Sequence, residues 1–323
     1  MPANLTPDYK RADDRFKAAT DDAERIEALQ EMLRTVPKHK GTEKMQADIK
    51  HRLSQLRKSA ARTAAHGPDP FHIPRSGAGQ VTLIGTPNTG KSLLVGRMTK
   101  APVKVTDYPY GTALPVPGMA HFEDVQIELV DTPPVAEGHV PAGLMGLVHS
   151  TDIVAVVVDL AADPLEQTDL VLGLLTARNT ALRTAPRKVL AAGQKSGLVV
   201  ANKSDMAGSD AVAALRELYG PAELDVLTTS AATGEGFDRL IARLWDLLAS
   251  IRVYTKQPGH PADHAKPFTM PIGSTVEDLA RLIHRELPEK MKFARLWGHA
   301  RFDGQQVHRT EPLRDKDIVE IHE

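Results

Sequence analysis

Residues 85–92 read Gly85-Thr86-Pro87-Asn88-Thr89-Gly90-Lys91-Ser92, and this octapeptide decides the fold of the central part of the chain. It fits the pattern G-x-x-x-x-G-K-[ST], in which glycines let backbone N–H groups turn toward phosphate oxygens. The apolar run 81–84 before it is typical of a buried strand, and residues 93–95 open a helical pattern after it. This order is the context that a phosphate-binding loop needs, because a helix N-terminus adds positive potential.

The residues of this loop have separate expected roles. Lys91 would reach the β- and γ-phosphates, and the Ser92 hydroxyl would be a ligand of Mg²⁺. The alternative is a chance glycine-rich turn, because short motifs also occur without function. The predicted phosphate contacts are Gly85, Pro87, Asn88, Thr89, Gly90, Lys91, Ser92 and Leu93.

A second motif, Asn202-Lys203-Ser204-Asp205, follows the apolar strand 198–200 and indicates which base is bound. A carboxylate at Asp205 can accept from both guanine N1–H and the exocyclic amine, whereas adenine would leave it unpaired. Lys203 would lie along the base, and Asn202 would brace the loop. Ser230-Ala231-Ala232 follows another apolar stretch, and a backbone N–H there would meet the guanine carbonyl. Together the motifs predict GTP and GDP binding.

Two further segments are candidates for loops that sense the γ-phosphate. The first is 107–112, in which Thr112 is the candidate to close on Mg²⁺; the alternative is an ordinary loop threonine. The second is 129–134, in which Asp131 at a strand end would hold Mg²⁺ through water. The predicted metal site therefore consists of Ser92, Thr112 and Asp131, and the predicted catalytic residues are Lys91, Asn88 and Thr112.

The second segment departs from the usual D-x-x-G pattern. Pro134 stands in place of the glycine and has no N–H to offer the γ-phosphate. Val135 stands where many GTPases orient the attacking water with glutamine. Asn88 could help to hold a K⁺ ion that stabilises transition-state charge, or it could simply favour the turn of the loop. His139 could be imagined as a base, but an ordinary loop histidine is the simpler interpretation.

With these residues, the chain resembles the Obg-type translation GTPases, and within them the developmentally regulated GTP-binding (DRG) branch. The resemblance rests on the phosphate loop, on Asp107-Tyr108-Pro109-Tyr110-Gly111-Thr112, and on the lead-in 35–44. Residues 253–256, 267–269, 273–279 and 302–305 are similar to a TGS domain, a small β-grasp module. The resemblance implies a role in translation or at the ribosome. DRG proteins also carry a domain inserted in the GTPase core, but the 42 positions from Asp159 to Ala201 leave no room for one.

The pattern of the whole chain predicts an α/β protein with a P-loop GTPase core, a mostly parallel sheet and helices on both faces. We expect a helical arm over 1–66, a linker over 67–79, the GTPase domain over 80–250 and a TGS-like β-grasp domain over 251–323. In the last, Ser274 is predicted to cap a helix, with Glu277 at capping-box spacing. The chain has no cysteine, its first 17 residues are polar, and its longest apolar run, 153–158, is too short to span a bilayer. These features predict a cytoplasmic protein without membrane contact.

The net charge of −1 is unevenly distributed. Residues 34–62 carry nine basic side chains against two acids, Glu43 and Asp48, a net charge of +7. Apolar residues at helical spacing, Ile26, Leu29 and Leu33 and then Met45, Ile49, Leu53 and Leu56, predict two helices. The two helices would form a hairpin around residues 37–41. The basic face is a candidate surface for RNA phosphates, and a solvated helix face is the alternative. A second, weaker candidate surface in the TGS-like segment has Arg281, Arg285, Lys290, Lys292, Arg295 and Arg301.

Two functions of different classes remain open on the sequence. One is a slow, Mg²⁺-dependent and K⁺-stimulated GTPase that acts on the ribosome or RNA through residues 34–62 and the TGS-like domain. The other is a regulatory protein that binds guanine nucleotides without hydrolysing them, with Pro134 and Val135 as marks of lost catalysis. The oligomeric state is not indicated by the sequence.

Overall fold

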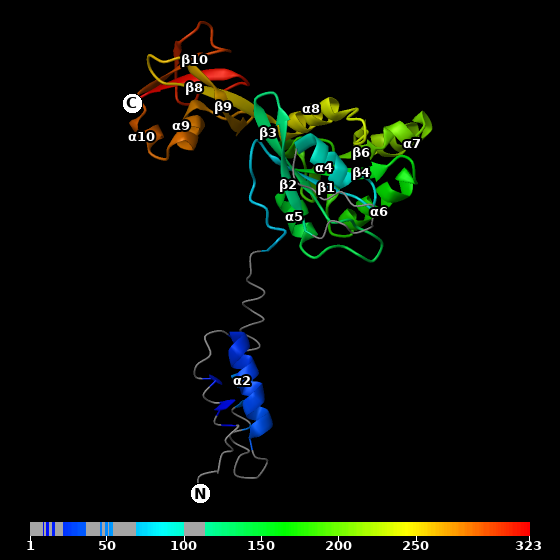
Figure 1. Cartoon of the computed structure of the whole chain (residues 1–323). Coiled ribbons are helices and arrows are strands. Elements are labelled where there is room, and N and C mark those ends of the chain that lie inside the picture. The colour runs from blue at the N-terminus through cyan, green and yellow to red at the C-terminus, as the bar shows by residue number, and fades with distance from the viewer. Residues whose placement is uncertain are drawn as a thin grey trace. The chain divides into compact units, whose positions relative to one another are not determined.

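The computed structural model describes residues 69–99 and 114–323, together with 9, 11–12, 15–16, 22–36, 46, 49–50 and 52–53 near the N-terminus. The chain divides into two compact units, Met1–Asp69 and Pro70–Glu323 (Figure 1). Among the described residues, none of the helices combines the length and the apolar character that crossing a bilayer requires.

The larger sheet of the second unit is mostly parallel, as the sequence predicts. Its order is β2-β3-β1-β4-β6-β5, and β7 pairs with β6. All neighbouring pairs are parallel except β2 and β3, which form an antiparallel hairpin. The strands are β1 (Gln80–Ile84), β2 (Val116–Phe122), β3 (Val125–Asp131), β4 (Ile153–Asp159), β5 (Ala181–Arg183), β6 (Gln194–Asn202) and β7 (Val226–Thr228).

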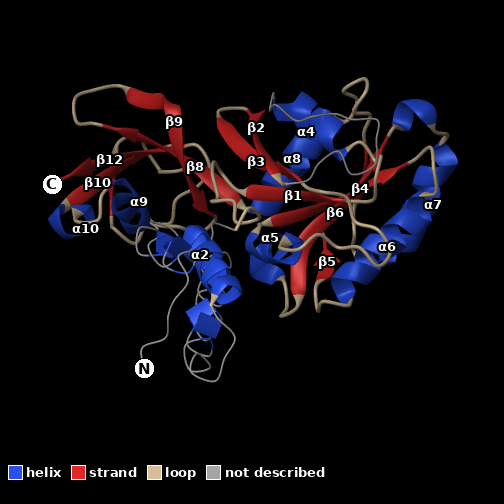
Figure 2. Ribbon diagram, turned by 60° about the horizontal axis from the view of Figure 1, so that its bottom comes forward, coloured by secondary structure: helices blue, strands red, loops and turns tan. Residues whose placement is uncertain are grey.

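Helices cover both faces of this sheet, which explains why its central strand is apolar throughout. Every residue of β4 is buried, and alternate side chains enter two different clusters of buried residues. Helices α5, α6 and α7 pack on one face, and α4 and α8 pack on the other (Figure 2). These helices are α4 (Lys91–Thr99), α5 (Leu144–Ser150), α6 (Pro164–Thr176), α7 (Ser209–Tyr219) and α8 (Phe237–Leu248).

No inserted domain interrupts this core between β4 and β6. The segment holds α6, β5 and the short 3₁₀ turn η2 (Arg187–Val189), all of them described. The absence of a large insertion, predicted from the spacing, is therefore confirmed. Two further 3₁₀ turns, η3 (Ser204–Met206) and η4 (Gly220–Ala222), follow β6 and α7.

The C-terminal part forms a separate sheet of order β11-β10-β12-β8-β9, in which β8 and β12 are parallel neighbours. Helix α9 packs its Val276, Leu279 and Ala280 against the apolar side chains of this sheet. The elements are β8 (Ser250–Lys256), β9 (Ala262–Pro271), α9 (Val276–Ile283), α10 (Leu287–Lys290), β10 (Phe293–Trp297), β11 (Gln305–Val307) and β12 (Asp317–His322).

The predicted cap of α9 is wrong by one residue. The Thr275 hydroxyl accepts from the Asp278 N–H at 3.3 Å, and the Asp278 carboxylate accepts from the Thr275 N–H at 2.9 Å. This reciprocal pair is the capping box. Ser274 instead donates its hydroxyl to the Pro271 carbonyl at 2.7 Å, while its own carbonyl accepts from the Leu313 N–H at 2.8 Å. Tertiary contacts thus hold Ser274 outside the helix.

The N-terminal unit contains α2 (Asp22–Thr35), the first helix of the predicted hairpin. Leu29 and Met32 of this helix share a buried cluster with Ile49 and Leu53 of the second helical segment. Tyr9 and Ala12, which are also helical, and Val36 belong to the same cluster. The predicted cap at Asp21 lies outside the described residues.

Residues 70–79, which fall within the predicted linker 67–79, pack against the GTPase core. Phe71 is buried among the side chains of α5 and its surroundings, and Ile73 packs beside it. The Ala78 N–H donates to the Gln126 carbonyl at 2.8 Å. Phe71, Ile73 and the backbone of Ala78 therefore attach a segment that its Ala, Gly and Pro content identified as a linker.

Candidate nucleotide-binding site

The phosphate loop connects β1 to α4, and its glycines are required by close contacts. A Cβ at Gly85 would lie 2.3 Å from the Val157 carbonyl oxygen. Gly90 has φ +87°, and a Cβ there would lie 2.4 Å from Asn202 Nδ2. Exposed Asn88 has φ 62°, a left-handed conformation that asparagine tolerates better than most residues. The turn of the loop alone therefore accounts for an asparagine at this position.

Lys91 is buried at the base of the loop. Its ammonium group donates to the carbonyls of Gly85 at 3.0 Å and Thr86 at 2.8 Å. Burial lowers the pKa of Lys91 to about 8, although the charge of Asp131 acts in the opposite direction. A phosphate at the loop would supply the negative charge that this buried cation lacks.

The two predicted metal-binding side chains that the structure describes lie in contact. The Ser92 hydroxyl donates to Asp131 Oδ2 at 2.6 Å, although 39 residues separate them in the sequence. A hydroxyl and a carboxylate oxygen suit Mg²⁺, which is usually held by one or two protein oxygens together with phosphate oxygens and water. In keeping with this, the described residues contain no cluster of three or more His, Cys, Asp or Glu that could hold a metal by themselves. Thr112, with the rest of 101–113, lies outside the described residues.

Asn202 braces two loops at once. Its Nδ2 donates to the Thr89 carbonyl at 2.8 Å, and its Oδ1 accepts from the Ala231 N–H at 2.9 Å. The side chain therefore ties the phosphate loop to the Ser230–Ala232 loop. Because the Ala231 N–H is already donated to Asn202, the Ala232 N–H is the better candidate to meet the guanine carbonyl.

The other two residues of the N-K-x-D motif also have partners. Lys203, in the left-handed conformation at φ 65°, pairs with Asp159 at 2.5 Å. Asp205 accepts from the Ser230 hydroxyl, whose oxygen in turn accepts from the Thr233 N–H at 3.1 Å. Ser230 therefore holds the Asp205 carboxylate in place and is itself held by the backbone of the same loop.

Two residues of this site were not predicted from the sequence. Arg97 in α4 donates to the Ala231 carbonyl at 3.1 Å and also to the Ala232 carbonyl. It holds the base-binding loop on the helix that begins at the phosphate loop. Asp159 at the end of β4 orients Lys203. Both belong to no local motif, so only the three-dimensional structure brings them to the site.

Comparisons with known proteins agree with this geometry. Residues 80–203 match the family described as 50S ribosome-binding GTPase, and residues 251–323 match the TGS domain. Developmentally-regulated G-protein 1 of Arabidopsis thaliana is 25% identical, over 92% of this chain and 90% of the relative. An uncharacterised GTP-binding protein of Halobacterium salinarum is 27% identical, over 92% of this chain and 98% of its own length.

The chain carries a GTPase domain and a C-terminal TGS domain, and it is similar to DRG-type GTP-binding proteins over most of its length. The fold is shared with a GTP-binding protein from Pyrococcus horikoshii, whose crystal structure matches 75% of this chain and 99% of its own, with TM-score 0.53 and 17% identity. The alignments with the Arabidopsis and Halobacterium relatives extend over 366 residues, more than the 323 of this chain. Both relatives therefore carry insertions that this chain lacks.

The second switch segment of the protein is anchored in the core. Thr132 is buried, and its hydroxyl donates to the Leu83 carbonyl at 2.6 Å. Val135 is fully buried and packs with the apolar cluster on the α5 side of the sheet, and its N–H donates to the Gly85 carbonyl at 3.1 Å. The side chain at the usual glutamine position is thus turned into the protein. His139 is an exposed loop residue beyond this segment, as the simpler interpretation predicts.

The remaining predicted residues have ordinary surroundings. Thr89 is buried, and its hydroxyl donates to the Thr86 carbonyl at 3.2 Å. Leu93 packs partly against the core, so its backbone rather than its side chain would meet a phosphate. Pro87 is half-buried in the loop.

Proposed function

We propose that this protein hydrolyses GTP slowly with the aid of Mg²⁺, and that it does so while bound to RNA or the ribosome. The observation that carries the proposal is the meeting of Lys91, the Ser92–Asp131 pair and the Asn202 brace at the carboxyl ends of β1, β3 and β6. Ligands of open α/β sheets bind at this edge, and here each part of a nucleotide has a matching group.

The protein's own residues would act mainly by charge and position. Lys91 would exchange its carbonyl contacts for oxygens of the β- and γ-phosphates and offset the charge that develops on them. Ser92, and Asp131 through water, would hold Mg²⁺, which would supply further neutralisation of that charge. Phosphoryl transfer needs little more than such positioning and electrostatic stabilisation.

The expected rate is low because the second switch offers no group to orient water. Pro134 has no N–H, and the Val135 side chain is buried in the core. A cation near Asn88 or a contact from a partner would have to supply what these positions lack. The same observation favours the second candidate function, a protein that binds GTP, does not hydrolyse it and uses it only to gate partner binding.

Our first prediction concerns Asn88 and separates these possibilities. Single-turnover GTP hydrolysis in KCl should be at least about tenfold faster than in NaCl, as expected for one added stabilising charge. Asn88→Gly keeps the left-handed turn but removes the side-chain oxygen, so it should lose the acceleration without losing GTP affinity. Asn88→Asp keeps a side-chain oxygen and should retain the acceleration in KCl.

Each other result has a definite meaning. Acceleration that persists in Asn88→Gly would assign Asn88 to the turn alone and remove it from catalysis. Tight GTP binding with no hydrolysis in either salt, and none when ribosomes are added, would reject the GTPase and favour the gated binding protein.

The RNA or ribosome part of the proposal rests on the segment 34–62. Among its basic residues, Arg34, Lys50 and Arg52 are described, and all three are exposed. The competing surface on the TGS domain is weaker than the sequence suggests. Arg281 pairs with both Glu277 and Asp278 at 3.3 Å, and Lys290 pairs with Glu286 at 3.0 Å. Those cations are partly neutralised by their own helices, so the N-terminal arm is the better candidate.

We therefore predict the effect of reversing Arg34, Lys50 and Arg52 to glutamate together. Binding to purified ribosomes or RNA should weaken by at least about tenfold, and the slope of log affinity against log salt should fall by about 2, because roughly three phosphate contacts are lost. GTP affinity should not change. Arg216→Glu, an exposed reversal on α7, is the control and should leave RNA binding intact. Ribosome binding that survives the triple reversal would exclude the arm as the interface.

A further inference from the structure

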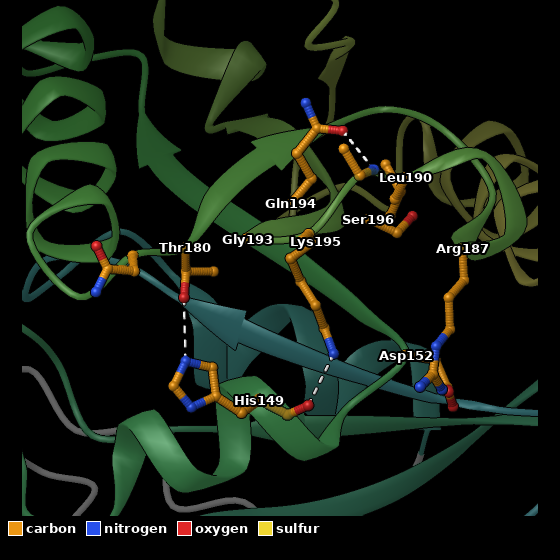
Figure 3. A pocket seen from close by; sticks show the side chains of 12 residues that line it. His149, Asp152, Thr180, Arg187, Leu190, Gly193, Gln194, Lys195 and Ser196 are labelled. Carbon is orange, nitrogen blue, oxygen red and sulfur yellow. Dashed lines mark hydrogen bonds between the residues drawn. The ribbon is translucent and has the colours of Figure 1, made fainter.

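A second pocket lies at the opposite edge of the GTPase sheet from the nucleotide site (Figure 3). Lys195 and Ser196 lie at the beginning of β6, whereas Asn202 at its other end belongs to the nucleotide site. His149 at the end of α5, Asp152 just before β4 and Arg187 of η2 also line the pocket. Its volume is about 400 Å³, within the range of pockets that hold small molecules.

Lys195 carries a positive charge in a partly buried position. Its ammonium group donates to the His149 carbonyl at 3.0 Å and to the Thr151 carbonyl. Burial lowers the pKa of Lys195 to about 8; the charge of Asp152 opposes this shift, and the charges of Arg187 and Arg75 add to it. Two carbonyls take up two of the three N–H groups, so one donor remains for a further partner.

The acid of the pocket is already paired. Asp152 Oδ1 lies 2.9 Å from Arg75, and its Oδ2 accepts from the Gln80 N–H at 3.0 Å. No described carboxylate lies within ion-pair distance of Lys195 or Arg187. The wall therefore holds two positive charges that no acid of the described chain balances.

The pocket also contains an unused hydrogen-bonding group. Ser196 is 1% exposed, and its hydroxyl has no hydrogen-bond partner in the described structure. Leaving such a group unsatisfied is costly, so a ligand that supplied a partner would be favoured. In the view of Figure 3, Lys195 lies between Thr180 on one side and Arg187 on the other. Thr180 is itself hydrogen-bonded to His149 at 3.1 Å, so the wall on that side is polar.

We propose that this pocket binds a small molecule carrying a phosphate group, with the phosphate held between Lys195 and Arg187. Two unbalanced cations match the double charge of a phosphomonoester, whereas a carboxylate would neutralise only one. Guanidinium and ammonium groups are the usual donors to phosphate oxygens. The volume of about 400 Å³ is in the range of pockets that hold a small molecule.

The test uses the whole protein saturated with GDP and Mg²⁺, so that the nucleotide site cannot take the probes. Inorganic phosphate, pyrophosphate and AMP are titrated separately by calorimetry. At least one should bind saturably, and Arg187→Ala and Lys195→Gln should each weaken that binding by about tenfold or more, as loss of a charge-assisted hydrogen bond implies. Arg178→Ala is the matched control, because Arg178 is exposed and outside the pocket, and its side chain donates to the Leu174 carbonyl of the preceding helix α6.

Asp152→Asn should have the opposite effect and guards against misfolding as an explanation. The amide oxygen can still accept from the Gln80 N–H, while the loss of negative charge should strengthen anion binding several-fold. A variant that merely damaged the fold would not bind more tightly.

Three results would overturn the proposal. The first is no saturable binding of any probe at millimolar concentration, and the second is unchanged affinity in Arg187→Ala. The third is a 5′-phosphorylated oligonucleotide that binds far more tightly than AMP and depends on Arg187, since this would assign the pocket to the end of an RNA chain.

Discussion

Asp205→Asn is expected to weaken GTP binding by about a thousandfold or more and to create affinity for xanthosine triphosphate. The carboxylate of Asp205 offers two acceptors to the N1–H and the amine of guanine. An asparagine would place its own N–H₂ against that amine, donor against donor. Xanthine has a carbonyl where guanine has the amine, so it would accept from the new amide.

The contacts of Ser230 favour one orientation of the asparagine. The Ser230 hydroxyl donates to Asp205, and its oxygen accepts from the Thr233 N–H. The amide oxygen of Asn would therefore stay toward Ser230 and the nitrogen would face the base. Competition of GTP and xanthosine triphosphate for a fluorescent nucleotide measures both affinities.

The neighbouring Ser204 provides the control for this exchange of specificity. Its hydroxyl donates to Glu235 at 3.0 Å, away from the predicted base contacts. Ser204→Ala should change neither affinity by more than about twofold, the usual range for a substitution at the surface. Unchanged GTP affinity in Asp205→Asn would mean that the base is read by other residues.

Sequence alone could predict those parts of the nucleotide site whose conformation is determined by a short segment of the chain. Gly90 is an example, because both its positive φ and its contact with Asn202 exclude any side chain. The strands also follow from local pattern, since β4 is apolar at every position before Asp159. Such features need no knowledge of distant residues.

The contacts that sequence analysis missed join residues far apart in the chain. Arg97 reaches a carbonyl 134 positions away, and Lys203 reaches an acid 44 positions away. No pattern in the neighbouring sequence indicates either contact. The error at the α9 cap has a related cause. Ser274 and Thr275 each precede an acid by three residues, and only the contact of Ser274 with Leu313 decides between them.

Arg252 carries the second large predicted effect. Its side chain is 4% exposed and pairs with Glu123 at 2.5 Å, Asp124 at 2.9 Å and Asp315 at 2.6 Å. Glu123 and Asp124 form the turn between β2 and β3 of the GTPase core, whereas Arg252 and Asp315 belong to the TGS domain. Tyr254 also donates to Asp124. The buried Arg252 guanidinium therefore joins the GTPase core to the TGS domain. It does so at the turn of the β2–β3 hairpin, whose two strands connect at their other ends to the switch segments 107–112 and 129–134.

Arg252→Met is expected to lower the free energy of unfolding by about 2–4 kcal/mol. Methionine keeps the apolar stem, but it leaves several carboxylates gathered without their cation. Removing one partner of a fully buried pair costs about 3–5 kcal/mol, and partial solvent exposure of these acids reduces that figure. Denaturant unfolding of both proteins measures the difference, and amide exchange should increase in β8 and in the turn 123–124.

The effect should also depend on pH in a defined direction. Hydrogen bonds from Arg252 and then Lys316 hold the pKa of Glu123 below its usual range. Burial raises the pKa of Asp315, but hydrogen bonds from Arg252 outweigh it and leave the pKa lowered. A carboxyl whose pKa is depressed by folding stabilises the protein above its ordinary pKa of about 4 and loses that contribution as the pH falls through the depressed value. The difference between wild type and Arg252→Met should therefore be full at neutral pH and shrink in acid.

Lys316→Met is the matched control, because Lys316 also pairs with Glu123, at 3.0 Å, but is 56% exposed. An exposed pair contributes less than about 1 kcal/mol, so this variant should be close to wild type at every pH. Equal effects of the two substitutions would show that burial of Arg252 is unimportant and that only the charge near Glu123 matters. A loss in Arg252→Met that does not diminish in acid would assign its effect to packing of the side chain, because an electrostatic contribution must disappear when the acids are protonated.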